Sequence, residues 1–381
     1  YGGVYCLGPL LVYNLANTQK NWLCDRAYLD SMQPLREYEM VGFTFQYELD
    51  IHHILKIVKE QGVQKENEER PLTFAGGPCV TNNPDILKDV VDFLFIGDCE
   101  DSLPRVLELY EKGMERETFL DALADIRGVY VPGRTRGITS AVVNLDEAPY
   151  PLYQPLPENI DKRFVFGDAF LLEVERGCPF RCTFCNIPGL YAGFRYRSLE
   201  YLKKIVDAGL VVTQRRKVVI YAPTFAHPDR KALLRYLLSK GVTFSIPSLR
   251  PEYVDLEELQ LIRKGGQKSL TFAPEAGETL RLQLNKRCKD ETFFAAFRSA
   301  HEAGFTKIKL YFLVGLPGQT EDDLREAVAF VAAAKKEFGG SISVSVNVLV
   351  PKNLTALEKE PFRRKEARQQ IDYFKGHMNC P

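Results

Sequence analysis

The sequence predicts an α/β protein in which an N-terminal doubly wound (Rossmann-like) domain is followed by a partial (β/α)6 barrel. Three observations carry this prediction. A chain of 381 residues is too long for one ordinary core. Short apolar runs that end in glycine alternate with amphipathic helices in both halves, which favours parallel sheets covered by helices. A proline-rich stretch separates the two halves.

The N-terminal third shows strand and helix signals of the lengths expected for βα units. Expected strands are 40–45, 72–75 and 90–96, and expected helices are 7–17, 50–61 and 102–112. Asp50 is the expected cap of the second helix and Gly62 its end. Two of the strands run into Gly76-Gly77-Pro78 and Gly97-Asp98, so a ligand crevice is expected at the carboxyl ends of this sheet.

The segment 128–165 changes character, because Pro149, Pro151, Pro155 and Pro157 favour extended chain. We therefore expect a domain over 1–135, a linker over 136–165, a barrel over 166–350 and an extension over 351–381. The extension is short, polar and basic, and we expect it to be a docking strip rather than a domain.

From residue 169 the βα rhythm resumes with longer units. The expected strands are 170–174, 217–222, 243–246, 269–273, 307–314 and 343–348, and helices are expected over 199–208, 230–239 and 321–337. Parallel strands with helices outside predict an open barrel whose chemistry lies at the carboxyl ends of the strands.

Composition excludes several classes of protein. Lysine plus arginine and aspartate plus glutamate each number 50, so no global field recruits nucleic acid or an anionic membrane. No apolar run approaches the 18 or so residues of a spanning helix. The odd cysteine count and the lack of a signal-like segment argue against a disulfide framework, so a cytoplasmic location is expected.

The strongest motif is C-P-F-R-C-T-F-C, which places Cys178, Cys182 and Cys185 on the loop after the first barrel strand. Thiolates at this spacing suit three corners of an iron–sulfur cube, and the fourth iron is then open to a ligand. A structural zinc site normally takes four ligands, and the next cysteine is Cys288. A disulfide between two of these three cysteines would leave the third thiol unpaired.

These residues resemble the radical S-adenosylmethionine (SAM) enzymes, whose signature is CxxxCxxC with an aromatic residue before the last cysteine, here Phe184. The resemblance continues in S-L-R at 248–250, T-F-A-P-E-A-G at 271–277 and K-L-Y-F-L-V-G-L-P-G-Q-T at 309–320. It implies a [4Fe-4S] cluster whose open iron chelates SAM. It also implies a ferredoxin- or flavodoxin-type electron donor and a 5′-deoxyadenosyl radical that removes hydrogen from a poorly activated carbon.

The resemblance implies SAM contacts along the strand ends. Arg250 would pair with the SAM carboxylate, Glu275 with its amino or ribose groups, and Ser248 lies beside Arg250 in the same motif. Gly315 and Gly318 would let backbone approach the adenosine. A structural salt bridge at the barrel rim and an ordinary turn are the alternatives. The family's G-G-E after the second strand is absent, and Y-A-P-T stands at 221–224.

The N-terminal domain resembles the cobalamin-binding domain that precedes the barrel in one subgroup of the family, through residues 41–48, 74–83 and 95–100. Its implied cobalamin contacts are Gly76, Gly77, Pro78, Gly97 and Asp98. The subgroup's D-x-H-x-x-G signature is missing, and His52 and His53 are expected on a helix surface. Cobalamin would then bind without histidine ligation, with a tyrosine or a water beneath the cobalt and Tyr1 and Tyr5 as the candidate tyrosines. A degenerate domain that binds no cobalamin is the alternative.

The resemblance as a whole implies a cobalamin-dependent radical SAM C-methyltransferase that uses methylcobalamin. Its expected substrate is a protein side chain, a glutamine or arginine such as those of methyl-coenzyme M reductase. Tyr221 and Tyr311 are expected to line the substrate site or relay a proton, with packing as the alternative role. A methylthiotransferase acting on tRNA or protein, and a cobalamin-binding sensor without turnover, remain open alternatives.

Overall fold

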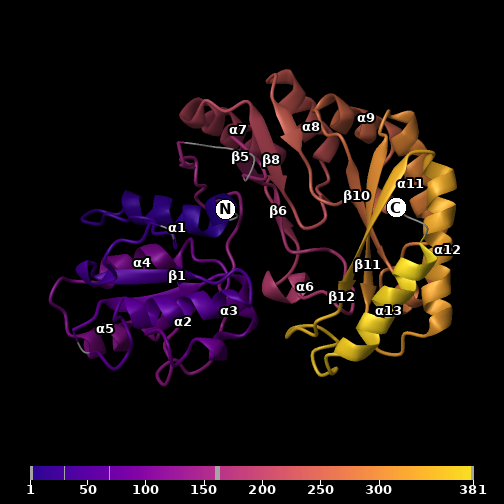
Figure 1. The fold of residues 1–381 in the computed structure, drawn as a ribbon. Coiled ribbons are helices and arrows are strands. Elements are labelled where there is room, and N and C mark those ends of the chain that lie inside the picture. The colour runs from indigo at the N-terminus through magenta and orange to yellow at the C-terminus, as the bar shows by residue number, and fades with distance from the viewer. Residues whose placement is uncertain (1–2, 30, 68, 159–163, 379–381) are drawn as a thin grey trace. The chain divides into compact units, whose positions relative to one another are not determined.

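The computed structural model describes residues 3–29, 31–67, 69–158 and 164–378. The chain divides into two compact units. One comprises Tyr1–Val165 with Leu190–Ala192, and the other comprises Phe166–Gly189 with Gly193–Pro381. Figure 1 shows the elements of each.

The first unit contains one four-stranded sheet in the order β1-β2-β3-β4. Its strands are β1 (Met40–Thr44), β2 (Leu72–Gly76), β3 (Phe93–Phe95) and β4 (Val129–Tyr130). Its helices are α1 (Leu7–Thr18), α2 (Asp50–Glu60), α3 (Pro78–Asn82), α4 (Ser102–Leu109) and α5 (Arg116–Leu123), and short 3-10 turns lie at Gly3–Tyr5, Leu35–Glu37 and Pro84–Ile86.

Two separate hydrophobic clusters cover the two faces of this sheet. One joins α1, α4 and α5 through residues such as Leu15, Val106 and Phe119. The other joins α2 and α3 through Ile54 and Val80. Because β1, β2 and β3 are parallel and both faces are covered, the expected Rossmann-like architecture is confirmed.

Three details of the first unit differ from expectation. The strand β4 runs antiparallel to β3 and was not anticipated. The expected strand 90–96 is only three residues long, because the amide N–H groups of Val90 and Val91 bond back to the carbonyl of Leu87 in a turn. Asp50 does not cap α2 from outside. It is the first helical residue, and its carboxylate accepts a hydrogen bond from the N–H of Tyr47.

The second unit contains six parallel barrel strands, as expected. They form the sheets β5-β8-β9 and β10-β11-β12, which the bridge Leu249↔Phe272 joins. The strands are β5 (Phe170–Glu173), β8 (Lys217–Tyr221), β9 (Thr243–Ser245), β10 (Leu270–Glu275), β11 (Lys307–Val314) and β12 (Ser341–Val348). The helices are α6 (Ile187–Leu190), α7 (Leu199–Thr213), α8 (Arg230–Ser239), α9 (Leu256–Lys264), α10 (Glu278–Gln283), α11 (Asp290–Glu302), α12 (Glu321–Phe338) and α13 (Arg364–His377), with a 3-10 turn at Pro251–Tyr253.

The outer face of the β10-β11-β12 sheet is apolar and covered by helices. Phe312 of β11 contacts Phe330 of α12 and Phe374 of α13, with ring centroids 6.2 and 5.7 Å apart. Within the extension, helix α13 therefore packs on the barrel and does not form a free strip (Figure 1). No helix of the described residues is both long and apolar enough to cross a membrane.

Candidate functional site

The cysteine loop is closed at its base by a short antiparallel hairpin. Its strands are β6 (Glu175–Arg176) and β7 (Arg195–Tyr196), and the loop between them carries Cys178, Cys182 and Cys185. Gly177 stands at the closure with φ +78°, and a Cβ there would lie 1.9 Å from the carbonyl oxygen of Gly193. Glycine is therefore required directly before the first cysteine.

The three thiols lie within electrostatic range of one another. Burial raises the pKa of Cys185, and the charges of Cys178 and Cys182 raise it further. Burial likewise raises the pKa of Cys178, while the N–H of Phe180 acts in the opposite direction by bonding to its sulfur. Amide donors aimed at sulfur suit thiolates that bind a cluster.

The described residues contain no group of three or more His, Cys, Asp or Glu side chains that converge on a single metal ion.

Two neighbouring segments hold the cysteine loop. The carbonyl oxygen of Leu284 accepts from the N–H and hydroxyl of Thr183 at 3.0 and 3.3 Å, and the amide of Asn285 donates to the carbonyl of Arg181 at 2.7 Å. These bonds come from the loop that follows α10. They fix the loop backbone independently of any bound group.

On its other side the loop meets Thr224, in the segment after β8. The Thr224 N–H and hydroxyl each bond to the buried carboxylate of Glu175 at 3.1 Å. The hydroxyl also contacts the sulfur of Cys178 and acts to lower the pKa of that thiol. The segment that lacks G-G-E is thus anchored by a carboxylate from β6.

Arg250 lies beside the cysteine loop. Its guanidinium stacks over the Phe180 ring at 3.8 Å, pairs with Glu252, and acts to lower the pKa of Cys178. Its Nε is buried and has no hydrogen-bond partner in the part of the chain that the structure describes. A buried unpaired donor beside the thiols suits a carboxylate ligand. Ser248, two residues earlier, is exposed.

Glu275 ends β10 with an unusual backbone. Its φ is +70°, and the pairing of β10 with β11 shifts register between Phe272 and Glu275. Its carboxylate pairs with the buried Lys286 at 2.9 Å, and its charge contributes to the raised pKa of Cys185. A non-glycine residue held in the left-handed region is a recurrent feature of functional sites.

The two glycines of the G-L-P-G turn after β11 have different surroundings. Gly315, with φ +74°, donates its N–H to Gln370 of α13 at 2.7 Å, and a Cβ there would lie 3.1 Å from Ala367. Gly318 has φ +71°, and a Cβ added there would have no atom within 4 Å. Packing against α13 accounts for Gly315, whereas Gly318 leaves its backbone accessible.

The three aromatic candidates, Phe184, Tyr221 and Tyr311, lie at different positions relative to the strand ends. Phe184, which lies within the cysteine loop, packs with a cluster that includes Leu280, Leu284 and Leu316. Tyr221 is the last residue of β8, as expected. Tyr311 is not at a strand end, because three more residues of β11 follow it, and its ring contacts the Lys309 ammonium at 4.6 Å.

The glycine loops of the first unit contact their own chain. A Cβ on Gly77, with φ +116°, would lie 2.8 Å from the carbonyl oxygen of Phe45. One on Gly97, with φ +82°, would lie 2.4 Å from the carbonyl oxygen of Ala141. One on Gly76 would meet only the Cβ of Phe95, at an ordinary 3.5 Å. Gly77 and Gly97 are thus required by the fold itself, and Gly76 is not.

Asp98 and Pro78 also have structural surroundings. The Asp98 carboxylate accepts the N–H of Val143 at 3.0 Å and so ties the segment 140–143 to the end of β3. Pro78 occupies the first turn of α3, where proline lacks no needed donor.

The two tyrosines proposed beneath the cobalt and the two histidines expected on a helix surface fall in three places. His52 and His53 are exposed on α2, as expected. Tyr5 is buried in the 3-10 turn Gly3–Tyr5. Tyr1 lies outside the described residues.

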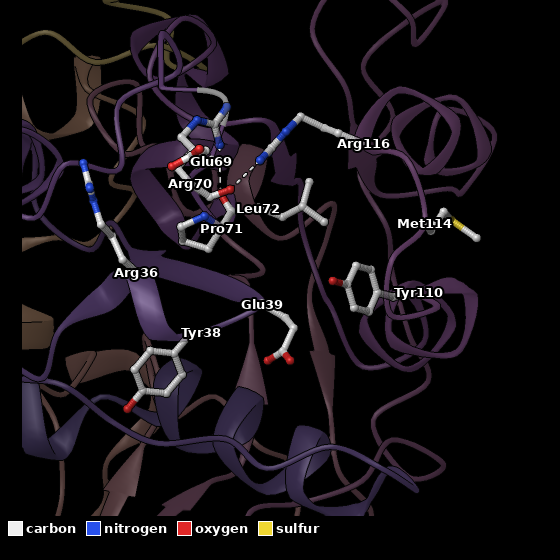
Figure 2. A pocket seen from close by; sticks show the side chains of 10 residues that line it. All are labelled: Arg36, Tyr38, Glu39, Glu69, Arg70, Pro71, Leu72, Tyr110, Met114 and Arg116. Carbon is white, nitrogen blue, oxygen red and sulfur yellow. Dashed lines mark hydrogen bonds between the residues drawn. The ribbon is translucent and has the colours of Figure 1, made fainter.

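A pocket of about 240 Å³ lies at the opposite edge of this sheet, beside the residues that precede β1 and β2 (Figure 2). It contains Arg36, Arg70 and Arg116, but these side chains are engaged. Arg70 forms two bonds of 2.6 Å with Asp92, Arg116 pairs with the same carboxylate at 3.1 Å, and Arg36 bonds to the carbonyl of Gly62. This pocket is a structural junction away from the glycine loops.

Fold and site together define a two-unit α/β protein with a cysteine loop built for an open iron–sulfur cluster. Family models agree. Residues 8–132 match the N-terminal region of radical SAM proteins, and residues 172–331 match the radical SAM superfamily. An uncharacterized protein of Methanocaldococcus jannaschii is 30% identical over 368 residues, which cover 94% of this chain and 77% of that one. The chain belongs to the radical SAM superfamily of enzymes.

Other similar proteins are more distant. One of M. jannaschii, named as a methylthiotransferase, is 23% identical over 79% of this chain and 66% of its own length. An uncharacterized methyltransferase of Pyrococcus horikoshii is 23% identical over 70% and 59%. The solved structure of the radical SAM methyltransferase TsrM from Kitasatospora setae, with cobalamin and a [4Fe-4S] cluster, aligns with a TM-score of 0.62 at 16% identity over 84% of this chain and 64% of that one. The fold, including the N-terminal unit, is thus that of TsrM.

Proposed function

We propose that this protein is a cobalamin-dependent radical SAM methyltransferase that methylates an unactivated carbon. The observation that carries the proposal is the hairpin-closed loop of three thiols, beside which lie Arg250, whose buried Nε has no partner among the described residues, and Glu275, whose backbone φ is positive. The fold shared with TsrM and the relative named as a methyltransferase support the choice of reaction.

The residues present fit a [4Fe-4S] cluster with SAM. Cys178, Cys182 and Cys185 would hold the cluster, the Nε of Arg250 would bind the SAM carboxylate, and Glu275 would accept from its amino or ribose groups. When bound, this pair supplies a radical able to remove hydrogen from an unactivated carbon. The chain orients the ligand from Arg250 and Glu275 and shields the thiols by burial.

Cobalamin would supply the methyl group, and its fit rests on Gly76. At this strand end a side chain would meet no close atom of the chain, so a flat ligand has access to the backbone. Ligation without histidine is part of the proposal, since His52 and His53 point to solvent from α2.

The substrate we propose is a protein side chain, glutamine or arginine, such as those of methyl-coenzyme M reductase. An electron donor of the ferredoxin or flavodoxin type would be a transient partner. Neither a membrane nor a specific nucleic acid is expected as a partner, because the formal net charge is zero.

The test uses the full chain, reconstituted without oxygen and supplied with cobalamin. We expect corrin absorption at one equivalent per chain, and 5′-deoxyadenosine together with a methylated peptide once SAM and a reductant are added. Retention of iron without any corrin would contradict the cobalamin part of the proposal. Corrin binding without SAM cleavage or methyl transfer would indicate a sensor.

A methylthiotransferase is the second candidate, favoured by the relative that carries that name. Such an enzyme needs a second cluster. Iron counting separates the two functions, because two [4Fe-4S] clusters give about eight irons per chain and one gives about four.

A further inference from the structure

The loop after α10 contains a lysine that sequence reasoning did not single out. Lys286 is buried, and its ammonium forms one ion pair, with Glu275 at 2.9 Å. The side chains of the two residues are 7% and 12% exposed. Because a buried ammonium is costly without a partner, the pair fixes where both groups lie.

The other half of the Glu275 carboxylate is free to act on a ligand. Lys286 contacts Oε1, and in the described part of the chain no hydrogen bond is made to Oε2. The positive φ and the register shift turn the end of β10 out of regular pairing at this residue. A carboxylate with one oxygen engaged and the other open is oriented before its ligand arrives.

The segment that carries Lys286 is rigid. Arg281, which is fully buried, donates from Nε to the carbonyl of Cys288 at 2.8 Å and from Nη1 to the carbonyl of Ala276 at 3.3 Å. Its guanidinium also stacks on Phe293 at 4.9 Å. Arg281 therefore joins the residue after Glu275 to a residue just after Lys286.

The same segment is bonded to the cysteine loop. Leu284 accepts from Thr183, and Asn285 donates to Arg181, directly before Lys286. Glu275 is also within electrostatic range of Cys185. The contacts with the cysteine loop, the buried Lys286 and the Glu275 carboxylate thus all lie within residues 275–286.

We propose that Lys286 is a positioning residue that holds Glu275 for the amino or ribose groups of SAM, and that Leu284 and Asn285 tie this carboxylate to the cluster loop. The inference rests on the proposed use of SAM. It does not depend on cobalamin or on the substrate.

The test compares Lys286→Met, Lys286→Arg and the exposed neighbour Lys289→Met in the reconstituted full chain. Iron content reports the cluster, and equilibrium dialysis together with the EPR spectrum of the reduced cluster reports SAM binding. We expect Lys286→Met to retain iron and to weaken SAM binding on the order of tenfold or more. Lys286→Arg should restore most of the affinity, and Lys289→Met should match the wild type.

A double-mutant cycle with Glu275→Gln separates positioning from general stability. On that background Lys286→Met should add less than about twofold, because its target carboxylate is gone. An equal loss on both backgrounds, or wild-type affinity in Lys286→Met, would overturn the proposal. If Lys286→Met does not fold, the cycle is run with Lys286→Gln, which removes the positive charge but keeps a polar side chain. Wild-type protein that binds SAM but no cobalamin would end the methyltransferase proposal and leave this one testable.

Discussion

The carboxyl edges of the two parallel sheets look alike in sequence and differ in structure. In the barrel, a Cβ added to Gly318 would have no atom within 4 Å. In the N-terminal unit, Gly77 and Gly97 are packed against carbonyl oxygens of Phe45 and Ala141. A glycine at a strand end therefore signals close approach, and only the structure says whether the approaching group is the chain or a ligand.

The buried arginine side chains of the two units are alike in their pairing and differ in their surroundings. Arg70 of the first unit and Arg250 of the barrel are each paired with a carboxylate, Asp92 and Glu252, and each keeps a buried Nε without a hydrogen-bond partner among the described residues. An unpartnered buried nitrogen therefore does not by itself mark a ligand site, and what distinguishes Arg250 is its position beside the three thiols.

The largest effect is expected at the thiols. Cys182→Ala should remove nearly all cluster iron, because a cube held by two thiolates lacks a protein ligand it needs. Iron and sulfide analysis after anaerobic reconstitution measures this. Cys24→Ala, in the other unit, is the control and should keep the iron. Full iron content in Cys182→Ala would show that the cluster is elsewhere.

Closure of the cysteine loop comes next. Gly177→Ala places a Cβ 1.9 Å from the Gly193 carbonyl oxygen and should lower the free energy of unfolding by more than about 2 kcal/mol and reduce bound iron. Gly167→Ala is matched, since its φ is +61° but nothing lies within 4 Å. If the two variants have the same melting temperature and the same iron content, the contact between a Cβ at position 177 and the Gly193 carbonyl oxygen does not control closure of the loop.

The junction of the N-terminal unit gives a pH-dependent prediction. Burial opposes ionisation of Asp92, but its bonds with Arg70 and Thr73 outweigh burial and lower its pKa. The pair therefore stabilises the unit above pH about 4, where an unfolded aspartate is ionised, and this stabilisation is lost as pH falls through the lower, folded-state pKa.

Asp92→Asn should cost about 3–5 kcal/mol near neutral pH and flatten the acid dependence of unfolding, because it leaves Arg70 buried without its counter-charge. Urea unfolding at several pH values tests this. Asp121→Asn breaks an exposed pair with Arg134 and should cost less than about 1 kcal/mol. A loss that does not diminish toward low pH would argue against the ion pair.

A substitution at Gly76 tests cofactor binding in the N-terminal unit separately from the stability of the fold. Gly76→Ala should leave stability within about 0.5 kcal/mol of the wild type, since its Cβ meets only Phe95 at 3.5 Å. If cobalamin lies against this backbone, the variant should bind less corrin. Gly97→Ala should lose stability and corrin together. Equal corrin in Gly76→Ala and the wild type would move the cofactor away from this strand end.

The smallest effect is expected at α13. Gln370→Ala removes the acceptor of the Gly315 N–H and should cost about 1 kcal/mol, with iron retained. Thermal melting measures it. Gln369, one residue earlier and exposed, gives the matched variant Gln369→Ala, which should be neutral. Loss of iron in the Gln370 variant alone would place α13 nearer to the cluster site than its contacts indicate.

The sequence by itself determined the fold class, the barrel strands and the cysteine loop. Apolar periodicity is a local property, and the strands over 170–173 and 307–314 follow it almost to the residue. Three cysteines at fixed spacing on one loop are also local, so no long-range contact is needed to recognise them. Arg250 and Glu275 came from the family resemblance, and both lie within electrostatic range of the thiols.

Only the tertiary structure showed which groups are engaged and which are free. Lys286 is one charged residue among 100 in the sequence, and nothing local marks it as buried against Glu275. The same holds for Gly97, whose neighbour Ala141 is 44 residues away, and for α13, whose polar sequence hides the Phe374 contact. Burial and pairing depend on segments distant along the chain, and local patterns carry no information about them.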